Sequence, residues 1–187
     1  MGTGVSTSFD KGFHLYGKTI FFIAVLLIAT GCSHKPKITT PSHKTNMSYQ
    51  TLIQKAQKKA SPQAKKILQK AREMSQKKRV IIRGSCWDYI NAIYNQAGFP
   101  QKKQKIIFKS KKRGPYAKSG MLKIGDWIYY VNHSFHNVGH SGIFIGWVDK
   151  TKKTGLTLSY AGLGRKTPAR YKVYDLSSVY HIIRPSK

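Results

Sequence analysis

Apolar residues follow two different periods in the two halves of this 187-residue chain, and this change of period most limits the folds open to it. From Met47 to Gly98 they recur every three or four residues, which is the spacing of amphipathic helices. From Gly125 onward, dense apolar runs separated by glycine and lysine turns indicate strands. Helices followed by strands predict an α+β fold with an antiparallel sheet. Because about 140 residues can enclose one core, we expect a single domain over residues 48–187.

The helical half divides at Ser61-Pro62, where a serine N-cap precedes a proline at the first helical position. We therefore expect one helix on each side of this pair, and we expect their shared apolar stripe to pack in the core rather than on a membrane surface. A third helix is predicted from about Ser85, with Gly98 as its stop signal. The residues of the apolar stripe are Ile53, Ala56, Ala60, Ala64, Ile67, Ala71 and Met74.

The strand-forming half contains four β-rich runs, and a short strand is also predicted over Lys105–Phe108. The four runs read "GDWIYYVN", "SGIFIGWVD", "LTLSYAG" and "VYHIIRP".

The N-terminus has the pattern of an export signal. Lys11 and Lys18 precede the apolar run "TIFFIAVLLIAT" (residues 19–30), which is shorter than the roughly 20 residues that a membrane-spanning helix needs. The following residues, Ala29-Thr30-Gly31-Cys32, resemble a bacterial lipobox. This resemblance implies that residues 1–31 form a lipoprotein signal peptide and that Cys32 becomes the lipidated first residue. An ordinary membrane anchor with an incidental cysteine is the alternative.

The composition of the segment after Cys32 indicates how the domain is attached to the membrane. Residues 32–47 are polar and proline-punctuated, so we expect a flexible tether. The protein would then lie in the cell envelope, lipid-anchored, and at the outer membrane if the cell is Gram-negative. We expect a monomer.

Charge points to polyanionic partners. The chain has 34 lysines and arginines against 6 acidic residues, a formal net charge of +28. For an exported lipoprotein, we expect such a surface to bind anionic lipid headgroups, lipopolysaccharide or cell-wall polymers such as peptidoglycan. Nucleic acid is the less favoured partner, because the sequence has no recognisable readout motif.

Cys86 is the candidate nucleophile. If Cys32 carries lipid, Cys86 has no intramolecular partner. At a helix N-terminus, free backbone N–H groups and the helix dipole favour the thiolate form of cysteine. The alternative is a buried, inert core cysteine.

His140 is the candidate base, because it opens the strand run "SGIFIGWVD" and a strand holds a side chain rigidly. A zinc site formed by His133, His136 and His140 is a minor alternative, although the strand-like flanks and Asn137-Val138-Gly139 argue against helical ligand spacing. We expect no metal and no cofactor.

Three features in this order resemble a known family. They are a cysteine opening a helix (Cys86), a Gly-Asp pair leading a strand (Gly125-Asp126), and the motif "HSGIFIG" (His140 to Gly146). Together they resemble the NlpC-type papain-like cysteine peptidases of bacterial cell walls and their CHAP amidase relatives. The resemblance covers about Ser48 to Pro185. It implies a papain-like fold with Cys86 as the nucleophile and His140 as the base.

The same resemblance implies a third residue that orients the histidine. An alignment on Ala161-Gly162 places Tyr160 in this position, although family members commonly have His, Asn or Gln there. Ser159 is the runner-up and is expected to face the opposite side of the strand. Asn132 and Asp88 are further contributors to consider.

Two functions follow from these features. The first is a cell-wall thiol hydrolase, either a peptidoglycan endopeptidase or an amidase, with acyl transfer as a variant of the same chemistry. The second is a catalytically inactive NlpC-like envelope lipoprotein that binds anionic polymers through its basic surface.

Overall fold

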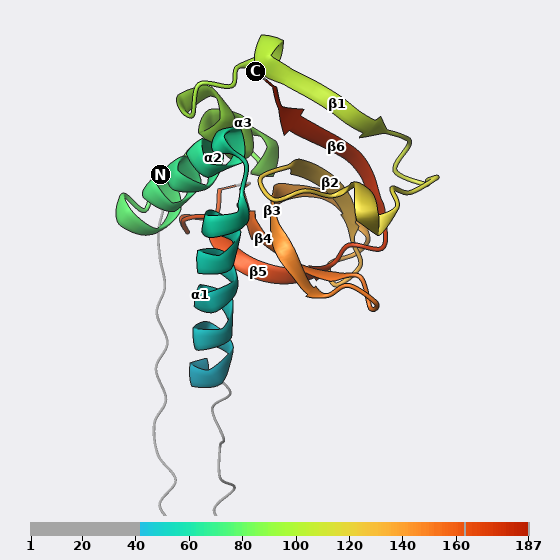
Figure 1. The fold of residues 1–187 in the computed structure, drawn as a ribbon, viewed down its shortest axis with the longest axis horizontal. Coiled ribbons are helices and arrows are strands. Elements are labelled where there is room, and N and C mark those ends of the chain that lie inside the picture. The colour runs from blue at the N-terminus through green and yellow to red at the C-terminus, as the bar shows by residue number, and fades with distance from the viewer. Residues whose placement is uncertain (1–41, 163, 187) are drawn as a thin grey trace, which may run out of the picture. The chain divides into compact units, whose positions relative to one another are not determined.

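The protein folds into an α+β domain with helices beside a six-stranded antiparallel sheet (Figure 1). The computed structural model describes residues 42–162 and 164–186. The helices are α1 (Ser42–Lys59), α2 (Pro62–Arg72), the π-helical turn η1 (Glu73–Lys77), α3 (Cys86–Gln96), and the 3₁₀ turns η2 (Gln101–Lys103) and η3 (Ser119–Met121). The strands are β1 (Gln104–Lys109), β2 (Trp127–Asn132), β3 (Val138–Asp149), β4 (Thr154–Ser159), β5 (Arg170–Asp175) and β6 (Val179–Pro185). Their order in the sheet is β1-β6-β2-β3-β4-β5, so β3 is an interior strand.

The predicted break between the first two helices is confirmed. The Ser61 side chain accepts a hydrogen bond from the backbone N–H of Ala64 at 3.2 Å, and Pro62 occupies the first position of α2. However, α1 begins at Ser42, inside the stretch predicted to be a flexible tether. Adding residues to an established helix costs far less free energy than nucleating one. The helix can therefore extend into this polar segment although its apolar residues follow no helical spacing.

The remaining predictions about the N-terminus fall on residues that the structure does not describe. These are the signal peptide over residues 1–31, the lipidation site Cys32, and the tether up to residue 41. Across residues 42–162 and 164–186, the helices are all too short or too polar to cross a bilayer.

The predicted third helix is also confirmed. Ser85 caps α3 in an extended backbone conformation, and Asp88 completes a capping box with it. After the last helical residues, Gly98 adopts a φ of +89°, which is favourable for glycine at a helix end.

The sheet is buried on both faces. Trp127, Ile143 and Ile145 pack into a core cluster with the helices. Their sheet neighbours Ile128 and Phe144 enter a second cluster, which forms on the opposite face. In Figure 1 the strands curve round on themselves while α1, α2 and α3 lie on one side of them. Burial on both faces explains why the β3 sequence is almost continuously apolar rather than alternating.

Strand β5 was not predicted from the sequence. It pairs with β4 in antiparallel register, with Ser159 opposite Arg170 and Thr157 opposite Lys172. Its sequence "RYKVYD" alternates polar and apolar residues, so it lacks the dense apolar run by which the other strands were identified.

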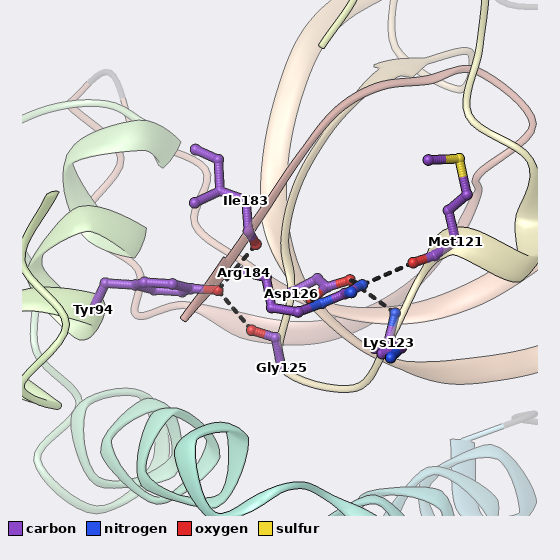
Figure 2. Close-up of polar contacts among 7 residues, drawn as sticks. All are labelled: Tyr94, Met121, Lys123, Gly125, Asp126, Ile183 and Arg184. Atoms are coloured by element: carbon purple, nitrogen blue, oxygen red, sulfur yellow. Dashed lines mark hydrogen bonds and ion pairs between the residues drawn. The ribbon is translucent and has the colours of Figure 1, made fainter. Parts of the chain in front are cut away.

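The Gly125-Asp126 pair joins three elements of the domain (Figure 2). The fully buried carboxylate of Asp126 accepts hydrogen bonds from Nε and Nη2 of Arg184, both at 2.7 Å, and from the backbone N–H of Lys123 at 2.8 Å. The Tyr94 hydroxyl of α3 donates to the carbonyl of Gly125 at 2.7 Å. These contacts tie the start of β2 to the end of β6 and to α3, so the role of Asp126 is structural. The hydrogen bonds from Arg184 to Asp126 also raise the pKa of Arg184.

Candidate functional site

Cys86 and His140 line the same cavity, which has a volume of about 490 Å³. The cavity wall comes from the start of α3, the hairpin between β2 and β3, the end of β4, and β5 with the loop that precedes it. Four elements that are distant in sequence therefore bring the candidate nucleophile and the candidate base to one place.

Cys86 is the first residue of α3 and is partly exposed. The Asp88 carboxylate accepts hydrogen bonds from the Ser85 backbone N–H at 2.7 Å and from the Ser85 hydroxyl at 2.8 Å. The Ser85 oxygen in turn accepts one from the Trp87 backbone N–H at 3.2 Å. The two hydrogen bonds that Ser85 donates to the Asp88 carboxylate, first that of its backbone N–H, lower the pKa of Asp88. Asp88 therefore fixes the helix start that presents Cys86, and its carboxylate is occupied there rather than by His140.

The loop after β4 also supports this helix start. Gly162 has a φ of +65°, and a β-carbon there would lie 2.8 Å from both the carbonyl oxygen of Gly84 and the α-carbon of Ser85. Only a residue without a side chain can follow this path beside the turn. Gly162 thus allows the β4–β5 loop to close over the backbone immediately before Cys86.

His140 is the third residue of β3 and is half-buried. Its ring lies edge-on to Tyr130 with centroids 5.5 Å apart, and its centroid is 5.7 Å from that of Tyr174. Burial, and secondarily the charge of Lys172, lower the pKa of His140 to about 4. The imidazole is therefore neutral at physiological pH, the form in which it can accept a proton.

No hydrogen bond joins the Cys86 sulfur to His140 in the described part of the chain. The two residues share a cavity without being in direct hydrogen-bond contact. Catalytic hydrogen bonds are often long in a ligand-free protein and tighten when substrate binds, and one water can bridge such a pair. A proton relay from the thiol to the imidazole would need one of these two rearrangements.

Tyr160 does not occupy the orienting position expected for it. Its ring stacks on Tyr89 with centroids 4.5 Å apart. Its hydroxyl donates a hydrogen bond to the carbonyl of Ile82 at 2.8 Å and accepts one from the Ile82 backbone N–H at 3.2 Å. Tyr160 is thus a buried side chain that anchors the segment leading to α3.

Ser159 lines the cavity instead, and its hydroxyl lies 3.0 Å from the Tyr174 hydroxyl. The register explains this exchange, because Ser159 is opposite Gly142 and residues directly opposite share a face. His140 lies two residues from Gly142 and therefore on that same face, whereas Tyr160 points the other way. The expectation that Ser159 faces away from the site was wrong, because Ser159 rather than Tyr160 lies on the sheet face that carries His140.

The other polar candidates lie at the edge of the cavity or outside it. Asn132 lines the cavity, and its side-chain oxygen accepts a hydrogen bond from Ser134 at 2.8 Å. His133 contacts the side chains of Asn137 and Ser178, each at 2.9 Å. Within residues 42–162 and 164–186, no three His, Cys, Asp or Glu side chains gather closely enough to hold a metal ion. The zinc alternative fails there because His133 and His136 belong to the exposed hairpin turn rather than to a helix.

Three cationic residues of the cavity were missed by the sequence reasoning. Arg165 comes from the β4–β5 loop, and Arg170 and Lys172 come from β5. Among the described residues that line the cavity, none is acidic. The alternation of charged and apolar residues in "RYKVYD" is the signal that could have located the strand and with it two of these three residues.

No protein-family model matches the chain, and no curated protein sequence matches it either.

Proposed function

We propose that this protein is a papain-like thiol hydrolase, lipid-anchored in the cell envelope, that cuts an amide bond in an anionic cell-wall polymer such as peptidoglycan. One observation carries the proposal: Cys86, at the N-terminus of α3, and His140, on interior strand β3, line a single cavity. The resemblance of the histidine strand to NlpC-type peptidases supports the same chemistry.

The reaction uses the two side chains in sequence. The Cys86 sulfur attacks the carbonyl carbon of the amide while the neutral imidazole of His140 takes the thiol proton. The backbone N–H of Cys86, at the start of α3, stabilises the oxyanion that forms. The carbon–nitrogen bond then breaks, and the amine leaves with the proton from His140. Water attacks the resulting thioester, again with His140 as the base, and releases the acid and the free thiol.

Digestion of purified peptidoglycan by the full chain tests the proposal. We expect new amine termini with wild type and a loss of at least 100-fold for Cys86→Ser and for His140→Ala, because nucleophile and base are each essential. A conservative change outside the cavity, Lys65→Gln on exposed α2, serves as the control. Cleavage that persists in Cys86→Ser would overturn the hydrolase proposal.

A second candidate function is an envelope-binding module with an inactive site. It is favoured by the basic lining of the cavity, to which Arg165, Arg170 and Lys172 contribute. In this case wild type and Cys86→Ala bind anionic vesicles equally at low salt and lose most of that binding near ~0.5 M salt, where screening shortens the reach of exposed charges to a few ångströms. Absence of peptidoglycan cleavage together with salt-sensitive binding would select this function over the first.

A further inference from the structure

We propose that Arg170 and Lys172 form an anion-binding subsite in this cavity, which binds a carboxylate of the substrate beside His140. That the bound carboxylate belongs to a substrate rests on the proposed function. The binding of a carboxylate can be tested separately, in protein that lacks the Cys86 thiol.

Strand β5 directs its cationic side chains to the cavity by simple alternation. Arg170, Lys172 and Tyr174 all line the cavity. The residues between them, Tyr171 and Val173, pack against the core cluster on the helix side. The two cations therefore belong to the sheet face that carries His140.

The cations of the cavity have no counterion among the residues that the structure describes. No ion pair of Arg165, Arg170 or Lys172 occurs in the described part of the chain, where the paired cations are Lys70, Lys78, Lys152 and Arg184. Arg170 and Lys172 are exposed to solvent, so water and salt screen their mutual repulsion, and an anion between them would remove the part that remains. A guanidinium presents a planar fork of donors that matches a carboxylate.

Two of the cationic side chains contact aromatic rings, which limit their positions without neutralising their charges. Lys172 Nζ lies 5.2 Å from the centroid of the Tyr174 ring. The guanidinium carbon of Arg165 lies 5.8 Å from the centroid of the Phe135 ring, so this contact joins the β4–β5 loop to the β2–β3 hairpin. Cation–π contacts limit the positions of the side chains and leave their charges available to a ligand.

Binding at this subsite would also affect the base. Tyr130 of β2 and Tyr174 of β5 contact the His140 ring, and Lys172 acts on its charge. The other titratable and charged groups that line the same cavity are Cys86, Arg165 and Arg170. No carboxylate is among these described residues. Because the charge of Lys172 helps to lower the pKa of His140, a carboxylate paired with Lys172 would raise that pKa and make the imidazole a stronger base. Recognition of an acidic substrate would thereby activate the residue that accepts the thiol proton.

The test uses the full chain carrying Cys86→Ala, purified in detergent, and two blocked tripeptides that differ only in charge: acetyl-Ala-Glu-Ala-amide and acetyl-Ala-Gln-Ala-amide. The pKa of His140 is followed by histidine nitrogen NMR, and affinity is taken from the same titration. We expect the Glu peptide to bind at least tenfold more tightly than the Gln peptide and to raise the pKa of His140. We expect Lys172→Gln and Arg170→Gln to lose this preference, Lys172→Arg to keep it, and the control Lys65→Gln to match the parent.

Equal binding of the two peptides, or an unchanged preference in Lys172→Gln, would overturn the subsite. Inorganic phosphate is titrated in parallel. If phosphate shifts the His140 resonance through Lys172 and the Glu peptide does not, the subsite is selective for phosphate and the carboxylate assignment is wrong. Because all of these proteins lack the thiol, a preference for the Glu peptide combined with failure of wild type to cleave peptidoglycan would uphold the subsite and reject only the hydrolase.

Discussion

Gly162 lies directly against Ser85, so that a β-carbon at position 162 would be 2.8 Å from the Ser85 α-carbon. The contact joins the loop after β4 to the residue that caps α3, and Cys86 follows Ser85 immediately. The backbone that presents Cys86 is therefore packed against a glycine 76 residues away in sequence.

The first prediction concerns this contact. We expect Gly162→Ala to displace the turn before Cys86 and to change the rate at which iodoacetamide alkylates the thiol at least threefold. Gly164→Ala is a matched control, because Gly164 also has a positive φ (+79°) but a β-carbon there meets nothing within 4 Å. Both variants carry backbone strain of about 1 kcal/mol, and only the first changes the surroundings of Cys86. Equal alkylation rates in the two variants would contradict the prediction.

A second prediction concerns the ion pair of Asp126 and Arg184. The Asp126 carboxylate is buried, whereas the Arg184 side chain is 23% exposed, and burial raises the pKa of Asp126 despite the hydrogen bonds from Arg184. Asp126→Asn weakens these charge-assisted hydrogen bonds, and such a bond typically contributes about 1.5–3 kcal/mol. We expect the free energy of unfolding, measured in urea, to fall by this amount. The double variant Asp126→Asn/Arg184→Gln is expected to recover part of the loss, since no unpaired charge remains. A single variant as stable as wild type would show that the pair does not hold β2 to β6.

A third prediction concerns pH and His140. Its pKa is about 4 in the folded protein, against 6.5 for a free histidine, so the unfolded chain binds more protons between these values. Stability is therefore complete above pH 6.5 and falls as the pH drops toward 4, by up to about 3 kcal/mol. Urea unfolding of wild type and His140→Gln from pH 4 to pH 7.5 measures this change in stability. Subtracting the free energy of the variant from that of wild type at each pH removes the contribution of His181, whose pKa is also lowered by burial.

The same shift predicts the pH dependence of the proposed hydrolysis. Activity is expected above about pH 5 and to fall with a midpoint near 4 in the free protein, because an imidazolium cannot accept the thiol proton. A midpoint near 6.5 in the free protein would mean that His140 is not buried as the structure has it.

The fourth prediction concerns the N-terminus. In a bacterial host, Cys32→Ala is expected to leave an unprocessed precursor and to abolish labelling with a fatty-acid analogue, because only the sulfur of Cys32 can form the thioether. Cys86→Ala is the control and is expected to be processed and labelled as wild type. Continued cleavage before residue 32 together with labelling of the Cys32→Ala protein would remove the lipoprotein interpretation.

Local sequence signals were sufficient for most of the secondary structure. Ser61-Pro62, Ser85 and Gly98 correctly marked helix boundaries, because caps, prolines and glycines act on the backbone within a few residues. The change from helical to strand-like periodicity correctly predicted the α+β class. Strand β5 was the exception, since a half-exposed strand of alternating residues has a weaker signal than a buried apolar run.

The fold class, most helix and strand positions, and the candidate pair Cys86 and His140 could thus be predicted from local patterns. The surroundings of this pair could not, because they depend on contacts between distant segments. Whether Ser159 or Tyr160 faces His140 depends on the register between β3 and β4, and a shift of one residue reverses the answer. The meeting of Arg170 and Lys172 with the start of α3 depends on chain segments about 85 residues apart, whose contact no local pattern specifies.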